Sequence, residues 1–392
     1  MKKRVLFMAL TSVALSSCVS DQMENGAGVA GPVKLTFDSP VLMNNSGTRA
    51  NYYGEVGSHT YDGSSTVYTY PKEEDFTIYA VQHDGDFAGW SAAQAHEINN
   101  TTVKYDQSVD GWAPKNSEDN YYYWPSGKMS FAATSPADLE LPGVATRAYG
   151  ANGLTITGFE VQSTADKHYD LLFSTRTINK TSADMLQGAS YYSGIPIQFQ
   201  HALSSVRFSI QNTTDADVVL KEIKVYGVKY KGDFAENLNE DATAYSKYVR
   251  GENVNPAWDV KNDTIKEADG YVGFTGSVGF PISAQYVAAL SAADTDEADE
   301  NEESHQLLLM PQVLTDAARV KVTYTVNGHQ HSKVAKFNEW KDTSDNEVDE
   351  WQMGVRYTYR LVYSQGTADK DKIYFSPSTD QWVEHDIVVI EL

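Results

Sequence analysis

The sequence predicts an all-β protein of sandwich type. Apolar and polar residues alternate over many segments, which is the two-residue period of a strand with one buried face. Turn-forming clusters of Gly, Asn, Asp and Ser, such as residues 61–65 and 326–330, separate these segments. Only residues 181–189 and 233–242 have the character of helical turns. The alternation, the turn clusters and the shortage of helical pattern together favour a β-sandwich.

The strands can be placed along the chain by the residues that share a face. The first, at residues 33–43, aligns Val33, Leu35 and Phe37. Residues 356–364 and 385–392 are also strand-like. Three further runs align on one face: Ile195, Ile197 and Phe199; Val206, Phe208 and Ile210; and Val320, Val322, Tyr324 and Val326.

Two polar residue types continue these apolar faces. His201 follows residues 195, 197 and 199 at the same spacing, so we expect its ring to face the core and to be hydrogen-bonded. Tyr357, Tyr359 and Tyr363 mark one face of the strand at 356–364. We expect them to pack in the core and not to form a sugar-binding platform.

The N-terminus is organised as a lipoprotein signal peptide over residues 1–17. A basic head is followed by an apolar run of about a dozen residues and by the sequence Leu15 to Cys18, which resembles a lipobox. Cys18 is the only cysteine in the chain, so it cannot form an internal disulfide. Because the lipobox places Cys18 at the cleavage site, we expect it to become the acylated N-terminus. We expect a lipid anchor and not a membrane-spanning helix, because no later run reaches 18 apolar residues.

Length and charge limit the classes of partner. The 392 residues include 41% hydrophobic residues, enough to bury sizeable cores, and the length favours two domains. We place their boundary near residue 190, giving domains at 50–190 and 191–392. The net charge of −22 makes nucleic acid and anionic membrane surfaces poor partners.

The residues that could perform chemistry form no recognisable catalytic motif. His329 and His331 lie two residues apart, but no Cys or carboxylate cluster completes a metal site beside them. The acidic run at residues 294–305 lacks the ligand spacing of a calcium loop and is expected to be solvated. We therefore expect no enzyme activity, no cofactor and no metal.

Several sequence blocks occur in the order typical of one protein family. The aromatic-Trp-Pro and Phe-x-Ala-x-x-Pro elements lie in residues 121–136, and the Phe-x-His-Ala-Leu-Ser-x-Val-x-Phe block lies in 194–212. Residues 223–234, 307–314 and 351–364 follow in the same order. Together these blocks resemble the fimbrillin-like lipoproteins of the Mfa-like family.

The resemblance implies a fold and a function. It implies two tandem transthyretin-like β-sandwich domains in a structural subunit of a bacterial cell-surface fimbria that supports adhesion. Such subunits travel as lipoproteins to the outer membrane, where an arginine-specific protease cuts the loop after the first strand. The strand then leaves a groove, which a donor strand from another fimbrial subunit fills.

The resemblance also places the cut between Arg49 and Ala50. Residues 44–54 are small and polar, as a protease-accessible loop requires, and they follow the first strand. The piece released would be residues 18–49, a lipid-anchored propeptide. A second Thr-Arg-Ala sequence at Arg147 lies in the middle of the first domain and is a poorer candidate.

The candidate donor is the C-terminal segment at residues 382–392. The same segment could equally be the closing strand of the second sandwich. Its two faces alternate, with Ile387 and Val389 on one and Val388, Ile390 and Leu392 on the other. Two alternatives to a strand-exchanging subunit stay open: an outer-membrane lipoprotein that binds glycans or host ligands, and a fimbrial tip adhesin. The sequence leaves a stalk, anchor or tip position undecided.

Overall fold

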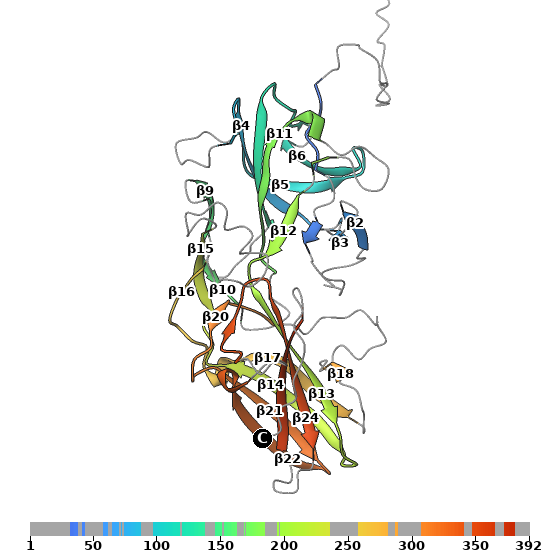
Figure 1. Cartoon of the computed structure of the whole chain (residues 1–392), viewed down its shortest axis with the longest axis vertical. Helices are drawn as coiled ribbons and strands as arrows, with labels where there is room; N and C mark the ends of the chain where they lie inside the picture. Colours follow the sequence, from blue (N-terminus) through green and yellow to red (C-terminus); the bar gives the residue numbers. More distant parts are fainter. Residues whose placement is uncertain are drawn as a thin grey trace, which may run out of the picture.

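The computed structural model shows an elongated all-β molecule whose sheets follow one another along its long axis (Figure 1). Its helical elements, within the described chain, are the short 3-10 turns η2 (Ser182–Asp184), η4 (Glu267–Asp269) and η6 (Phe337–Glu339). No helix in that part of the chain is long and apolar enough to cross a membrane. The structure describes residues 32–37, 41–43, 58–61, 65–69, 72, 74–87, 97–117, 120–137, 146–150, 153–162, 168, 170–184, 194–195, 197–235, 258–280, 287–288, 307–340, 347–364 and 372–380.

The largest sheet has ten strands in the order β2-β3-β1-β12-β11-β8-β4-β5-β6-β7. Neighbouring strands are antiparallel, except that β1 runs parallel to β12. The strands are β1 (Val41–Met43), β2 (Ser58–Tyr61), β3 (Ser65–Thr69), β4 (Phe76–His83), β5 (Ile98–Asp106), β6 (Gly111–Ser117), β7 (Asn120–Tyr121), β8 (Lys128–Ser135), β11 (Leu172–Lys180) and β12 (Gln198–His201).

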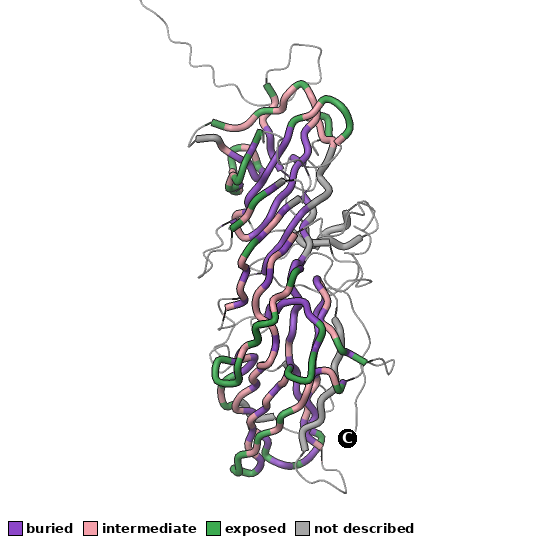
Figure 2. The backbone as a smooth tube through the Cα atoms, turned by 90° about the vertical axis from the view of Figure 1, so that its left-hand side faces the viewer, coloured by how far each residue is buried: buried purple, intermediate pink, exposed green. Residues whose placement is uncertain are grey.

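The central strands of this sheet are buried on both faces, as the tube coloured by burial shows (Figure 2). In β4, Phe76 and Ile78 belong to one hydrophobic cluster, whereas Tyr79 and Val81 belong to another. Successive strand residues point to opposite faces, so one strand contributes to both cores. The smaller cluster, which contains Phe76, lies within the N-terminal half, and we call it the N-terminal core.

A four-stranded sheet covers the other face of these central strands. Its order is β16-β15-β10-β9, and its Tyr149, Ile156 and Phe234 share a hydrophobic cluster with Tyr79 of β4. The strands are β9 (Thr146–Gly150), β10 (Gly153–Glu160), β15 (Lys231–Ala235) and β16 (Trp258–Val260).

Two facing sheets form the C-terminal part of the molecule. Alternate residues of β21 are buried, as the sequence pattern from Val320 to Val326 predicts. One sheet contains β13 (Ser204–Asn212), β18 (Val287–Ala288), β19 (Leu307–Leu309), β24 (Arg356–Ser364) and β25 (Lys372–Asp380). The other contains β14 (Val218–Tyr226), β17 (Tyr271–Phe280), β21 (Arg319–Val326) and β22 (His329–Lys336), and a two-stranded sheet pairs β20 (Gln312–Val313) with β23 (Glu350–Trp351).

This architecture confirms the all-β fold and is consistent with two tandem sandwiches. Strands from both sides of residue 190 nevertheless share sheets, because β12 pairs with β11 and β15 pairs with β10. The predicted boundary near residue 190 stays a prediction. The chain first enters the C-terminal sheets at β13, which begins at Ser204.

Candidate functional site

The segment from Val33 to Phe37 is the N-terminal part of the strand predicted at residues 33–43, and we call this segment the first strand; β1 (Val41–Met43) is the C-terminal part of the same predicted strand. The first strand fits between two separate parts of the N-terminal half. On one side it is antiparallel to residues 112–124, and on the other it runs parallel at Ile195. Its backbone groups alternate between these sides, as in any strand with a neighbour on each edge. The hydrogen bonds run from Leu35 N to Tyr122 O (2.8 Å), from Phe37 N to Trp112 O (2.7 Å), from Trp112 N to Phe37 O (3.0 Å), from Trp124 N to Val33 O (2.9 Å) and from Ile195 N to Thr36 O (2.9 Å).

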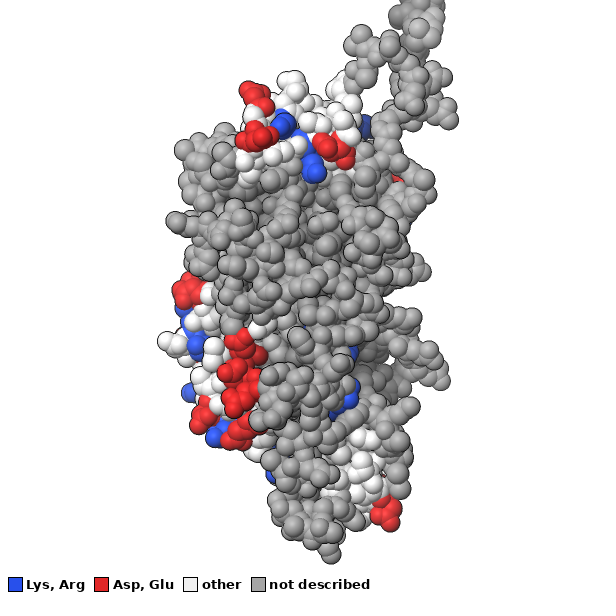
Figure 3. Space-filling model, viewed as in Figure 1, with Lys and Arg blue, Asp and Glu red and all other residues white. Residues whose placement is uncertain are grey.

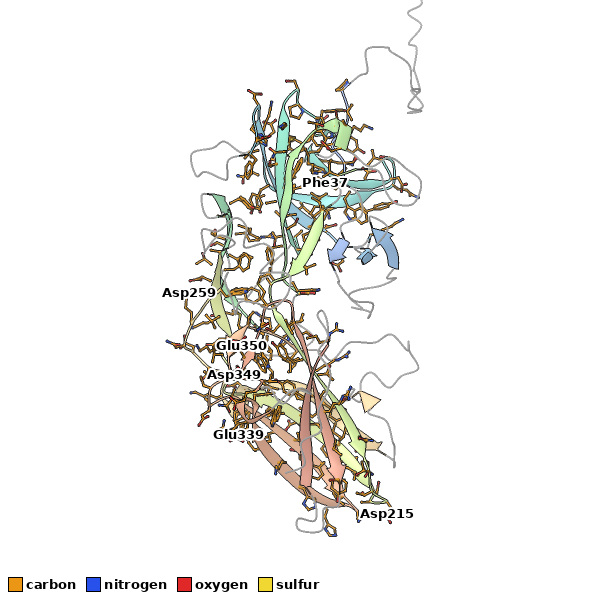
Figure 4. The ribbon with its side chains drawn as sticks, in the orientation of Figure 1. Phe37, Asp215, Asp259, Glu339, Asp349 and Glu350 are labelled. Atoms are coloured by element: carbon orange, nitrogen blue, oxygen red, sulfur yellow. The ribbon has the colours of Figure 1, made fainter. Side chains whose placement is uncertain are left out.

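The same segment supplies side chains to the N-terminal core. Leu35 and Phe37 are completely buried, whereas Val33, predicted on the same face, is half-buried. The ring of Phe37, labelled in Figure 4, packs edge-to-face on Phe131 at 5.3 Å and on Phe76 at 6.0 Å between ring centroids. The first strand is therefore an integral part of the N-terminal core and does not merely pack on its surface.

Removal of this segment would leave a groove with defined chemistry. The amides of Trp112, Trp124 and Ile195 would lose their acceptors, and the carbonyls of Trp112 and Tyr122 would lose their donors. The space vacated by Phe37 would be lined by aromatic rings. Unpaired strand edges beside apolar pockets are the features that bind an added β-strand.

A polar network supports the strand edge next to this segment. Asp106 accepts hydrogen bonds from the Tyr121 hydroxyl (2.6 Å) and from the amide and hydroxyl of Ser108 (2.9 and 2.7 Å), and it pairs with Lys115 at 2.8 Å. Burial by itself would raise the pKa of Asp106, but these donors outweigh it and hold that pKa well below its usual range. The Asp106 carboxylate is therefore a fixed negative charge.

The residues predicted to be acylated, cleaved or donated to another subunit all lie outside the described residues. They are Cys18, Arg49, Ala50 and the candidate donor residues Ile387, Val388, Val389, Ile390 and Leu392, and their roles stay predictions. The alternative arginine, Arg147, is described. It lies in β9, is partly buried, and donates hydrogen bonds to the carbonyls of Pro136 and Ala137. A protease would have to disrupt a paired strand to reach it.

The structure confirms the predictions for the polar residues on core faces. His201 is buried, and its Nδ1 lies 2.7 Å from Oδ2 and 2.9 Å from Oδ1 of Asp170. Tyr357, Tyr359 and Tyr363 are buried as packing residues. Burial raises the pKa of Tyr357 and of Tyr359, so both phenols stay protonated.

The residues considered as metal ligands form no metal centre within the described ranges. His331 stacks on Tyr324 with ring centroids 5.6 Å apart. Acidic side chains also gather along one flank of the molecule (Figures 3 and 4), and they include Asp259, Glu339, Asp349 and Glu350. No group of three or more His, Cys, Asp or Glu among the described residues is arranged to hold a metal ion. The acidic run at 294–305 lies outside those residues.

Sequence reasoning did not identify the groove edges or the polar network behind them. The Asp-x-Ser spacing of Asp106 and Ser108 is a signal for a side-chain turn, and the structure contains that turn. The contact of this turn with Tyr121 joins residues distant in the sequence, so no local sequence pattern predicts it. The pairing of Phe37 with both Trp112 and Ile195 is likewise non-local.

Comparisons with known proteins place the chain in a family. Among solved structures it is similar to a candidate cell adhesion protein from Bacteroides uniformis (14% identity, 90% of this chain and 98% of that chain covered, TM-score 0.45). It is also similar to another from Bacteroides ovatus (12%, 92% and 98%, 0.44) and to the tip fimbrial protein Mfa3 from Porphyromonas gingivalis (9%, 79% and 94%, 0.29). No curated protein matches the chain. The fimbrillin-like family model matches residues 48–382, which confirms the resemblance seen in the sequence blocks, and the chain belongs to the fimbrillin-like family.

Proposed function

We propose that this chain is a structural subunit of a bacterial cell-surface fimbria that polymerises when a strand from a neighbouring subunit replaces its first strand. Family membership supports a fimbrial role. The observation that carries the strand-replacement step is the position of residues 33–37, which are bonded on both edges and buried in the N-terminal core.

The energetics of this segment explain why a replacement strand would be needed. Each of its backbone hydrogen bonds contributes about 0.5–1.5 kcal/mol net. Complete burial of Leu35 and Phe37 contributes about 1.5–3 kcal/mol per side chain. These contributions together are comparable with the stability of a whole domain, about 5–15 kcal/mol. A subunit that lost the segment would be marginally stable until another strand restored the same contacts.

A cut in the loop after the first strand would make this loss possible. Before cleavage, residues 33–37 are covalently continuous with the body of the subunit, and the effective concentration of the strand at its groove is high. After cleavage between Arg49 and Ala50, only non-covalent contacts would retain it. A donor strand at high local concentration could then compete for the groove.

The route to the cell surface has two processing steps. Acylation of Cys18 anchors the precursor to the outer membrane, and cleavage at Arg49 releases the body of the subunit from the lipidated piece 18–49. The C-terminal segment 387–392 is the candidate donor, because its alternating aliphatic residues could enter the pockets left by Leu35 and Phe37. Assembly by this route needs no catalytic step by the chain and no cofactor.

Mass spectrometry of the protein isolated from surface fimbriae tests this proposal. The expected N-terminus is Ala50, with residues 18–49 absent from the filament. A surface lipoprotein that binds glycans or host ligands would keep its anchor and its first strand. An acylated Cys18 on the working form of the protein would therefore contradict the proposal.

A further inference from the structure

The first strand also contacts the groove through a cation–π interaction, which is neither a backbone hydrogen bond nor apolar packing. The ammonium of Lys34 lies 4.7 Å from the centroid of the Tyr121 ring. Leu35 N and Val33 O bond to the opposite edge on either side of Lys34, so the register of this residue is fixed. Because Leu35 faces the core, the side chain of Lys34 points to the other face, towards Tyr121.

Tyr121 is held in place and is suited to attract a cation. Its hydroxyl donates to Asp106 at 2.6 Å and contacts the Ser108 hydroxyl at 3.0 Å. A phenol that donates to a carboxylate has a more electron-rich ring, and a cation over the ring is attracted by its negative face. Lys115, which neutralises part of the Asp106 charge, also lies 4.8 Å from the ring centroid.

The carboxylate of Asp106 keeps its negative charge over the physiological pH range. The donors around Asp106 keep its pKa well below the usual value despite the opposing effect of burial. An acidic residue placed over Tyr121 would meet the negative face of the ring and the Asp106 carboxylate at its hydroxyl end, whose charge Lys115 neutralises only in part. An aliphatic residue at that place would lose the cation–π attraction and gain no buried pocket.

We propose that Tyr121 and Asp106 form a cation subsite of the strand-binding groove. The subsite selects strands that carry Lys or Arg directly before the aliphatic residue that fills the place of Leu35. This inference rests on the proposed strand replacement, and it adds a rule for which strands the groove prefers. A slip by one residue would carry the cation into the apolar pocket, so the subsite also specifies register.

The subsite favours the resident strand over the candidate donor. If the C-terminal segment enters in the direction of the first strand with Ile387 in place of Leu35, Asp386 lies over the Tyr121 ring. If Val388 takes the place of Leu35 instead, Ile387 lies over the Tyr121 ring. Neither residue supplies a cation, so an uncut subunit keeps its own strand when it meets the C-terminus of another copy.

Peptide binding to the nicked full-length protein tests the inference. A site for a sequence-specific protease, inserted between residues 44 and 50, allows the loop to be cut without relying on Arg49. Labelled peptides of residues 31–43 are then added, with the native sequence, with Lys34→Met and with Lys34→Glu. A fourth peptide combines Val33→Lys with Lys34→Val, which keeps the cation but moves it by one residue. Fluorescence anisotropy measures the Kd of each.

We expect the Lys34→Met peptide to bind about two- to fivefold more weakly than the native peptide, as the loss of an exposed cation–π contact implies. The Lys34→Glu peptide and the shifted-cation peptide should bind more weakly still. In a Tyr121→Leu subunit the native and Lys34→Met peptides should bind equally. In Tyr121→Phe, which keeps the ring, the native peptide should retain an advantage.

The results distinguish failure of the cation subsite from failure of strand replacement. Equal binding of all four peptides to the unsubstituted subunit overturns the cation subsite and leaves strand replacement intact. Failure of every peptide to enter the groove overturns both. If Tyr121→Leu does not fold, the peptide series on the unsubstituted subunit still decides the question.

Discussion

Replacing Phe37 with Ala should destabilise the uncut subunit but not the fimbria. Phe37 is completely buried and packs edge-to-face on two other rings of the N-terminal core. Truncation of a buried Phe to Ala costs about 3–5 kcal/mol, including the cavity left behind. The two ring contacts, each contributing about 0.5–1.5 kcal/mol beyond burial, place this site in the upper part of that range. In the assembled fimbria the residue would be absent, so the expected cost there is zero.

Phe199→Ala provides the matched control. Phe199 is also completely buried in the N-terminal core and packs edge-to-face on Phe76 at 5.7 Å, but it belongs to β12, which stays in the subunit. This substitution should therefore destabilise both the uncut subunit and the fimbria. Both variants can be followed by guanidinium unfolding with tryptophan fluorescence, because Trp112 and Trp124 lie beside the groove.

Two results would refute this reasoning. If Phe37→Ala shifts the unfolding midpoint of the fimbria as far as Phe199→Ala does, the first strand has not been replaced. If Phe37→Ala leaves the uncut subunit as stable as the unsubstituted protein, residue 37 does not contribute to the core as described. An increased rate of polymerisation after cleavage is the expected accompanying effect, because a weakened resident strand dissociates faster.

Four further changes test other parts of the account. Cys18→Ala should abolish membrane association of the exported protein in detergent partitioning, because no other thiol is available for acylation; normal association would remove the lipoprotein step. Arg49→Ala should yield a full-length subunit that forms no ladder on gels, and ladders would move the processing site elsewhere. Deletion of residues 386–392 should leave the subunit folded but unable to elongate; unfolding would assign that strand to its own core, and continued elongation would exclude it as donor. Asp106→Asn should lower the unfolding free energy at pH 7 by about 1.5–3 kcal/mol. The native pKa of Asp106 is lowered, so this contribution is complete well above the ordinary value of 3.8 and declines as the pH falls below it. A pH-independent difference between variant and parent would contradict the charge assignment.

Side-chain orientation along each strand was readable from the sequence, because it depends only on local alternation. The burial of Leu35, Phe37 and His201 follows from their spacing. Period two specifies which face a residue occupies but not which strand lies beside it. The pairing of β10 with β15, and of residue 37 with both Trp112 and Ile195, joins segments far apart in the chain, and no local pattern encodes it.

The polar contacts around the groove were the least predictable part of the candidate site. Tyr121 occurs in a run of three tyrosines, and the sequence pattern is equally compatible with a packing role for all three. Its role depends on Asp106 from β5 and Lys34 from the first strand reaching the same ring. Arg147 shows the opposite case, in which a sequence that matches a cleavage pattern is held in a paired strand.

Hydrogen exchange of the groove amides in assembled fimbriae tests strand replacement most directly. The amides of Trp112, Trp124 and Ile195 donate to carbonyls of the first strand in the uncut subunit. If another strand takes its place, peptides containing these amides should stay protected in the fimbria, although mass spectrometry finds residues 33–37 absent. The same amides should exchange rapidly in a cut subunit whose first strand has been removed. Protected amides together with a retained first strand, or exposed amides in the fimbria, would contradict the account.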